Sequence, residues 1–249
     1  MADVHFDGLA ALYSHVRQAT PANRYFYDFW SEQMLAQVPI PLTGSVTLDC
    51  MSGSCEFARV AGKRVGVLYA TDISLGILQR AEADTQLAGR ACADARLLPY
   101  GADTFDVAFV RGGLHHVPDT FVHVLAELHR VLKPGGWLVC SEPVDDNPIV
   151  QAARGFLHRI SPHYDPEERG LRLLDLLRGF DEAGFSQIDV QPFGYVAYTL
   201  IGNMDVFPLF RRLRNKTCLR FLTWIDHVSP RVPGWRRLAL TRMIRGRVT

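Results

Sequence analysis

Residues 45–72 read SVTLDCMSGSCEFARVAGKRVGVLYATD, and this stretch decides the fold. An apolar run ends at Asp49, a turn of small residues follows, and a second apolar run ends at Asp72, 19 residues after Gly53. This order is typical of the first βαβ unit of an open parallel sheet, in which the turn admits a nucleotide-like ligand and the second acid binds a ribose. Because the turn has one glycine where such turns usually have two or three, an ordinary strand–turn–helix remains the alternative.

Length and composition predict an ordinary globular protein. A chain of 249 residues, 48% hydrophobic and 21% charged, can bury a sizeable core as one α/β domain with appendages. The amino terminus lacks the pattern of a secretory signal, and no run of about 18 uncharged apolar residues occurs, so we expect a cytoplasmic protein without a spanning helix. The five cysteines lack framework spacing and are expected to be buried thiols. Cys50 and Cys55 would supply only half of a metal site, so no metal is expected.

The net charge of +1 conceals an asymmetry. Residues 205–249 contain ten Arg and one Lys against Asp205 and Asp226, a balance of +9, so the first 204 residues sum to −8. A mildly acidic body with a basic tail suggests that the tail meets an anionic partner.

Apolar runs alternate with helical patterns along most of the chain. Expected strands lie at residues 45–49, 65–72, 90–94, 105–110 and 137–143, and a closing hairpin at 184–190 and 194–200. Expected helices lie at residues 7–18, 22–37, 74–87, 120–132, 149–160 and 169–183. This alternation predicts a Rossmann-like α/β fold: a mostly parallel seven-stranded sheet with helices on both faces and an antiparallel last strand.

Acids, paired histidines and small residues gather just past the ends of the expected strands. These positions are Asp49 to Gly53, Asp72, Asp94, Arg111 to His116, and Glu142 with Pro143. In such sheets ligands bind outside the carboxyl ends of the strands, so the pattern predicts one shared ligand site.

Four motifs at matching separations carry a family resemblance. They are TLDxxxG from Thr47, ATDIS from Ala70, DA…LPY…FD from Asp94, and LHHVPD from Leu114 followed by LKPGG from Leu132. With them, residues 45–143 resemble the cofactor domain of class I S-adenosylmethionine-dependent methyltransferases, and the segment to about 200 does so loosely. The chain is therefore predicted to have three parts: a helical cap at 1–44, the cofactor domain at 45–204 with an insertion at about 145–168, and a basic amphipathic appendage at 205–249.

The resemblance also implies a role for each matching residue. Asp49 and the turn through Met51 and Gly53 would hold the methionine part of S-adenosylmethionine. Asp72 would bind the ribose and Ile73 would pack on the adenine. The remaining cofactor-side residues are Asp94 and Ala95 at the adenine edge, and Arg111 and Gly112 beside the methionine moiety.

The turn departs from the family at Met51 and Cys55, where glycines are usual. A non-glycine residue in left-handed geometry costs about 1–2 kcal/mol, and its Cβ takes up space. The sequence leaves three outcomes open: negative φ at these positions, weak or displaced cofactor binding, or loss of methyl transfer.

His115 and His116 are the candidate catalytic residues, because an imidazole near neutral pKa can deprotonate a hydroxyl or an amine. A capping or orienting role is the alternative for each, and methyl transfer needs mainly in-line positioning. Candidate acceptor-side residues are Tyr13, Tyr25, Glu142, His163 and Tyr164.

The predicted function is methyl transfer to an oxygen or nitrogen of a small-molecule acceptor. Lipid-linked and anionic molecules are among the acceptors considered. The alternatives are a non-methylating binding module and a peripheral membrane protein that uses the fold as a platform. In the tail, Phe210, Leu213, Phe221 and Trp224 share a helical face. A docked helix with a solvated basic face, a membrane-surface anchor and a nucleic-acid contact remain open for it, the last without a recognisable module.

Overall fold

The structure, a computed structural model, describes residues 20–82, 85–147, 171–202 and 207–249. The strands are β1 (Val46–Cys50), β2 (Val67–Asp72), β3 (Gly89–Cys92), β4 (Phe105–Arg111), β5 (Leu132–Pro143), β6 (Phe185–Phe193) and β7 (Thr241–Val248). The α-helices are α2 (Pro21–Leu35), α3 (Ala58–Ala61), α4 (Leu75–Leu78), α5 (Phe121–Val131), α7 (Leu173–Glu182) and α8 (Lys216–Val228). Short 3₁₀ or π turns are η1 (Leu114–His116), η2 (Tyr198–Gly202), η3 (Pro208–Arg212), η4 (Ser229–Arg231) and η5 (Trp235–Leu238).

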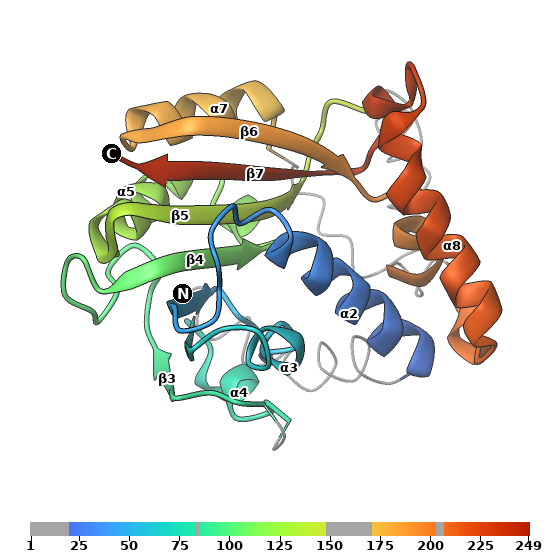
Figure 1. The fold of residues 1–249 in the computed structure, drawn as a ribbon, viewed down its shortest axis with the longest axis horizontal. Coiled ribbons are helices and arrows are strands. Elements are labelled where there is room, and N and C mark those ends of the chain that lie inside the picture. Colours follow the sequence, from blue (N-terminus) through green and yellow to red (C-terminus); the bar gives the residue numbers. More distant parts are fainter. Residues whose placement is uncertain (1–19, 83–84, 148–170, 203–206) are drawn as a thin grey trace.

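All seven strands form one sheet in the order β3-β2-β1-β4-β5-β7-β6. The pairs among β1 to β5 are parallel, whereas β7 is antiparallel to both β5 and β6. Helices flank the sheet, with α2 and α3 on the near face and α5 and α7 behind it (Figure 1). The predicted Rossmann-like sheet with an antiparallel last strand is confirmed.

Two hydrophobic clusters cover the two faces of the sheet. The first joins side chains of α2, α3 and α8 to β2, β4 and β5, and the second joins α5 and α7 to β1, β4 and β5. The central strand β4 has fully buried aromatic side chains in both, with Phe109 in the first cluster and Phe105 in the second. Strict alternation would put residues four apart on the same face, and the register shift between Phe105 and Val107 is what places the two rings on opposite faces.

The helix expected at residues 22–37 is observed as α2. The Thr20 side chain caps it by accepting a hydrogen bond from the backbone N–H of Asn23 at 3.1 Å, and Pro21 occupies the first turn, where a missing N–H has no cost. The helix expected at 74–87 is much shorter, because α4 ends at Leu78. The helices expected at 7–18 and 149–160 lie outside the described residues.

The closing hairpin is wrong in its second strand. Residues 194–200 form no strand; they lead into η2, and the seventh strand comes instead from Thr241–Val248. The sequence concealed β7 because Arg242, Arg245 and Arg247 interrupt it. Each arginine has a place within the sheet: Arg242 is 7% exposed and donates to the Ala239 carbonyl, and Arg245 pairs with Asp189.

The segment from residue 205 is therefore not an appendage to a sheet completed before it. It holds an insertion, from η3 through η5, between β6 and β7, and then the strand that lies between β5 and β6. The face of its main helix was also predicted wrongly, since α8 buries Leu219, Leu222, Thr223 and Asp226 and leaves Phe221 and Trp224 exposed. Within the described ranges, no helix combines the length and the apolar character needed to cross a bilayer.

Candidate active site

The carboxyl ends of four strands bring charged side chains to one edge of the sheet. Asp49 lies in β1, Asp72 ends β2, Arg111 ends β4, and Glu142 lies near the end of β5. Because these strands are parallel and their order reverses between β1 and β4, this edge is where open α/β sheets bind ligands. Asp49, Arg111 and Glu142 are buried, so their charges require partners in the protein or in a ligand.

The turn after β1 has the backbone of a glycine-rich loop without most of the glycines. The angle φ is +57° at Met51, +56° at Gly53 and +60° at Cys55, all in the left-handed region. Of the outcomes that the sequence left open, negative φ at Met51 and Cys55 is wrong. The surrounding structure therefore holds two side chains in a geometry that costs about 1–2 kcal/mol each.

The two side chains that replace glycine pack toward opposite faces of the sheet. Met51 is half-buried against the second cluster, where a Cβ on Gly113 would lie only 2.7 Å from its Sδ and 2.8 Å from its Cβ. Cys55 is fully buried in the first cluster, and burial raises the pKa of its thiol to about 12, so it stays protonated near neutral pH. Gly113 thus makes room for Met51.

Asp72 connects the turn to the next loop. Its Oδ2 accepts a hydrogen bond from the Gly53 N–H at 2.8 Å, and its Oδ1 accepts one from the Ser74 N–H at 3.0 Å. Burial raises the pKa of Asp72, and these backbone hydrogen bonds oppose the shift. Each oxygen keeps a lone pair for a further donor, so the carboxylate can still take the two hydroxyls of a ribose. Ile73 is half-buried beside it.

Asp49 has a buried oxygen, Oδ2, that no described residue binds. Burial raises the pKa of its carboxyl to about 8; Arg111 opposes the shift, and Glu56 and Asp72 add to it. With this pKa the Asp49 carboxyl is mostly protonated near neutral pH, and a cationic ligand beside it would favour its charged form. The expected cofactor has a sulfonium and an amine, so the unpaired oxygen and a carboxyl that a cation would ionise both fit it.

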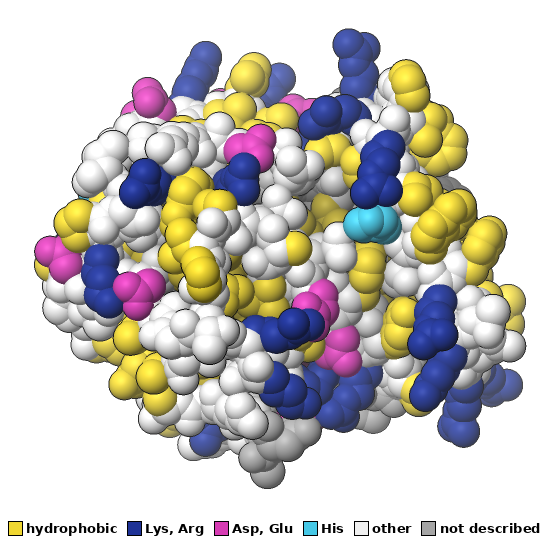
Figure 2. All heavy atoms as spheres, in the orientation of Figure 1, with side chains coloured by type: hydrophobic (Ala, Val, Ile, Leu, Met, Phe, Trp, Pro, Cys, Tyr) yellow, Lys and Arg dark blue, Asp and Glu magenta, His cyan; other side chains and the backbone are white. Residues whose placement is uncertain are grey.

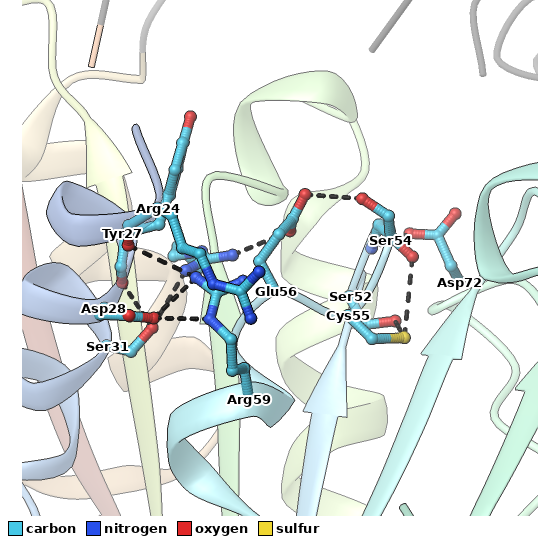
Figure 3. Close-up of polar contacts among 12 residues, drawn as sticks. Arg24, Tyr27, Asp28, Ser31, Ser52, Ser54, Cys55, Glu56, Arg59 and Asp72 are labelled. Atoms are coloured by element: carbon cyan, nitrogen blue, oxygen red, sulfur yellow. Dashed lines mark hydrogen bonds and ion pairs between the residues drawn. The ribbon is translucent and has the colours of Figure 1, made fainter. Parts of the chain in front are cut away.

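A buried ion pair joins the turn to β4. Arg111 Nη2 lies 3.0 Å from Glu56 Oε2, and the Ser54 hydroxyl donates to Glu56 Oε1 at 2.6 Å. Figure 3 shows Glu56 and Ser54 beside Asp72 above the strand ends. Sequence reasoning missed Glu56 and Ser54. The available signal was an acid flanked by apolar residues in a segment that had to be buried.

Helix α2 covers Arg111 from the other side. Arg111 Nη1 donates to the Ser31 hydroxyl at 3.2 Å, and its guanidinium carbon lies 5.1 Å from the Tyr27 ring centroid and 5.7 Å from that of Trp30. The Trp30 indole N–H donates to the Ser141 hydroxyl of β5 at 2.9 Å. These contacts make α2 a wall of the site, and they fix the guanidinium beside the turn.

Asp94 and Ala95 lie past the end of β3. The Asp94 carboxylate folds back onto Arg96, whose Nη2 lies 2.5 Å from Oδ2, and this hydrogen-bonded contact lowers the pKa of Asp94. Ala95 is buried in the second cluster. The adenine role of Asp94 stays a prediction, and it requires the carboxylate to share its oxygens with Arg96.

Glu142 organises η1 and the first candidate catalytic histidine. It is fully buried; its Oε1 accepts from the N–H groups of Gly113 and Leu114 at 2.9 and 3.0 Å, and its Oε2 lies 2.9 Å from Nδ1 of His115. An ionised carboxylate only accepts hydrogen bonds, so in the neutral form of His115 this contact favours the tautomer with its proton on Nδ1 and a lone pair on Nε2. Glu142, expected on the acceptor side, is positioned to orient His115.

His116 and Gly112 complete this corner of the site. The rings of His115 and His116 are 4.1 Å apart, and His116 acts electrostatically on Asp72, where it lowers the carboxyl pKa. Gly112, with φ +62°, donates from its N–H to the Ser141 carbonyl at 2.8 Å. His115 therefore lies at the end of β5, and the neighbouring His116 is close enough to the end of β2 to act on Asp72.

The other acceptor-side candidates divide in two. Tyr25 is half-buried on α2, packed against the first cluster. Tyr13, His163 and Tyr164 lie outside the described residues, and their roles stay predictions.

Comparisons with known proteins agree with this geometry. A family model described as a methyltransferase domain matches residues 48–140. A demethylmenaquinone methyltransferase from Halalkalibacterium halodurans is 37% identical over 201 residues, which cover 70% of this chain and 81% of that protein. The enzyme of the same name from Lactiplantibacillus plantarum is 26% identical over 218 residues, covering 77% of this chain and 90% of the relative.

Solved structures share the fold. A methyltransferase from Thermotoga maritima that depends on S-adenosylmethionine superimposes with a TM-score of 0.67 at 15% identity, covering 98% of each chain. Phosphoethanolamine N-methyltransferase 2 of Haemonchus contortus, solved with S-adenosyl-L-methionine, gives a TM-score of 0.60 at 18% identity, covering 94% of this chain and 59% of that one.

Proposed function

This chain belongs to the class I S-adenosylmethionine-dependent methyltransferase family, and we propose that its acceptor is a small lipid-linked molecule with an ionisable hydroxyl group. Its cofactor is S-adenosylmethionine, whose sulfonium supplies an electrophilic methyl group when bound. The two relatives described above are named for demethylmenaquinone, a small lipid-linked quinone, which supports this acceptor class. Oxygen or nitrogen stays our prediction for the methylated atom.

The observation that carries the proposal is the pair formed by His115 and Glu142. The buried carboxylate holds Nδ1 of the imidazole at 2.9 Å, and Nε2 has no partner among the described residues. The histidine side chain is 16% exposed, so it is accessible from the site while its carboxylate partner is not. This arrangement is that of a general base oriented by a buried acid.

The chemistry of the pair follows from the tautomer. Nε2 of His115 takes the proton of an acceptor hydroxyl, and the negative charge of Glu142 stabilises the imidazolium that forms. The resulting oxyanion is a better nucleophile than the neutral hydroxyl. Asp72 and the backbone of the turn hold the cofactor, while its cationic part favours the charged form of the Asp49 carboxyl.

The test is a methylation assay with a reduced, short-chain demethylmenaquinone analogue in detergent micelles, with product mass as the readout. We expect a gain of one methyl group, and a kcat lowered by about 100-fold or more in His115→Ala with unchanged binding of S-adenosylhomocysteine. The matched control is His123→Ala, which changes an exposed histidine on α5. Methylation of amines but not of hydroxyl-bearing rings, or full activity of His115→Ala, would overturn the proposal.

Glu142 is tested as a positioning residue by its pH profile. Glu142→Gln removes the charge behind the imidazole, so the pH above which kcat reaches its plateau should fall together with kcat. A uniform loss of activity with an unchanged profile would make Glu142 structural only.

A further inference from the structure

The outer face of α8 exposes large apolar side chains. Phe221 and Trp224 are 58% and 56% exposed, and their rings stack with centroids 6.0 Å apart at an interplanar angle of 20°. They lie opposite the buried residues Leu219, Leu222 and Asp226 of the same helix. An apolar pair of this size on the solvent side of an amphipathic helix contributes nothing to the core beneath it.

Exposed apolar side chains also occur in the turns that follow α8. Val232, Trp235 and Leu238, in or beside η4 and η5, are 38%, 44% and 37% exposed. We call these three residues, together with Phe221 and Trp224, the α8 surface. Two tryptophans and a phenylalanine are the side chains that proteins place at the interface between lipid and water.

Exposed cations flank the α8 surface along the chain, and no exposed acid lies in the described residues 207–240. The exposed cations of residues 207–240 are Arg212, Arg214, Lys216, Arg220, Arg231, Arg236 and Arg237. The acid of this segment, Asp226, is 1% exposed and accepts four hydrogen bonds from the backbone N–H groups of residues 195–198. Figure 2 shows hydrophobic and Lys or Arg side chains together along the edge of the molecule that α8 forms in Figure 1.

We propose that the α8 surface docks on the surface of an anionic lipid bilayer. The charge is complementary to acidic headgroups, because the cations of this segment have no exposed described carboxylate beside them in the sequence. The exposed rings can insert among the headgroups, as interfacial helices with aromatic and basic side chains do. Neither property alone indicates a membrane. Together they match one, because the cations can contact the acidic headgroups while the apolar rings reach the lipid layer beneath them.

The position of α8 connects docking to the site. Figure 1 shows α8 on the same side of the molecule as the carboxyl ends of β4 and β5, with α2 between them. Leu219 and Leu222 of α8 pack in the cluster that contains Phe26 and Trp30 of α2, and Trp30 contacts Arg111. Docking would therefore bring the acceptor-binding edge close to the bilayer. The inference goes beyond the proposed function and holds for any acceptor.

The test is sedimentation of the full chain with lipid vesicles. Wild-type protein should bind vesicles that contain phosphatidylglycerol about tenfold or more better than vesicles of phosphatidylcholine alone, and added salt should weaken binding. Phe221→Ser with Trp224→Ser should lower binding by about tenfold or more. The matched control is Leu174→Ala, which removes a side chain 66% exposed on α7 and should leave binding unchanged.

Charge is tested separately. Arg220→Gln, Arg236→Gln and Arg237→Gln together should abolish the preference for anionic vesicles, whereas Lys63→Gln, Arg64→Gln and Arg178→Gln remove the same charge elsewhere and should keep it. Equal binding to neutral and anionic vesicles, no binding, or equal losses in both triple variants would overturn the proposal. So would release from vesicles by sub-stoichiometric RNA, which would make nucleic acid the preferred partner.

Activity on the soluble micellar acceptor separates this inference from the proposed function. The α8 variants should keep wild-type kcat in micelles and lose activity only on acceptor embedded in vesicles. Equal loss in both assays would contradict a docking role for α8, whereas inactivity of the wild type in micelles would count against the proposed function alone.

Discussion

Charged side chains are buried in the turn at residues 49–56 and exposed in the insertion around α8. In the turn, Asp49 and Glu56 are buried together with Arg111, and one carboxylate oxygen has no described partner. Around α8 the cations are exposed, and the helix has its one acid on the inner face. The buried charges of the turn can therefore act only on a ligand that the protein encloses, whereas the exposed charges of α8 can contact a surface outside the protein.

The largest effect on stability is expected from removing the buried ion pair of the turn. Glu56→Leu leaves the Arg111 guanidinium without its carboxylate inside the protein, which should lower the free energy of unfolding by about 3–5 kcal/mol. Urea denaturation measures it. Arg220→Gln, on the exposed side, should change stability by about 0.5 kcal/mol or less. A loss under about 1 kcal/mol in Glu56→Leu would mean that the pair is dispensable.

Substitutions on the inner and outer faces of α8 should change the free energy of unfolding by different amounts. Asp226→Ala leaves four backbone N–H groups at residues 195–198 without their acceptor and should cost about 2–3 kcal/mol. Phe221→Ala, on the outer face, should be nearly neutral in the same thermal or urea titration. Similar losses in both variants would show that the outer face also contributes to folding.

The raised pKa of Asp49 should make the stability of the protein depend on pH. A carboxyl whose pKa rises from 3.8 to about 8 on folding binds its proton more tightly in the folded protein, so stability falls as pH rises through that range. Asp49→Asn cannot titrate. Relative to it, the ligand-free wild type should lose roughly 2 kcal/mol between about pH 5.5 and pH 7. Parallel stability curves for the two proteins would place the Asp49 pKa near its ordinary value.

The smallest effect concerns the replaced glycines. Gly113→Ala would force a Cβ against Met51 and should cost about 1–2 kcal/mol. Met51→Gly removes both the left-handed strain and some packing, so it should be nearly neutral, and the double variant should recover most of the loss. Strictly additive losses in this cycle would show that Val110, not Met51, limits the space at Gly113.

Much of the fold could be predicted because local patterns specify it. Most of the strands β1 to β5 contain apolar runs, and the charged residues near their ends predicted a shared edge for the cofactor, whose binding by these residues stays a prediction. The origin of β7 could not be predicted, since its pairing partners lie far away in sequence and its arginines conceal the strand. Arg245, for example, pairs with Asp189 and donates to the Gln37 carbonyl, neither of which is near it in the chain.

The site was predicted in part for the same reason. Asp72 and His115 follow recognisable strands, so their positions were available from the sequence. The role of Glu142 depends on the distance between β5 and η1, and the inward orientation of Asp226 depends on a backbone turn at residues 195–198. Hydrophobic periodicity places an acid outside and an aromatic side chain inside, and α8 does the reverse in both respects.

The position of β7 between β5 and β6 affects the order in which the sheet can form during synthesis. When a ribosome has translated as far as Phe193, strands β5 and β6 both exist, but the strand that belongs between them has not been made. The nascent chain must keep two unpaired edges apart, and prevent them from pairing with neighbouring chains, until Val248 has left the exit tunnel. Closure of this part of the sheet therefore has to wait for β7, which is synthesised after both of the strands that it joins.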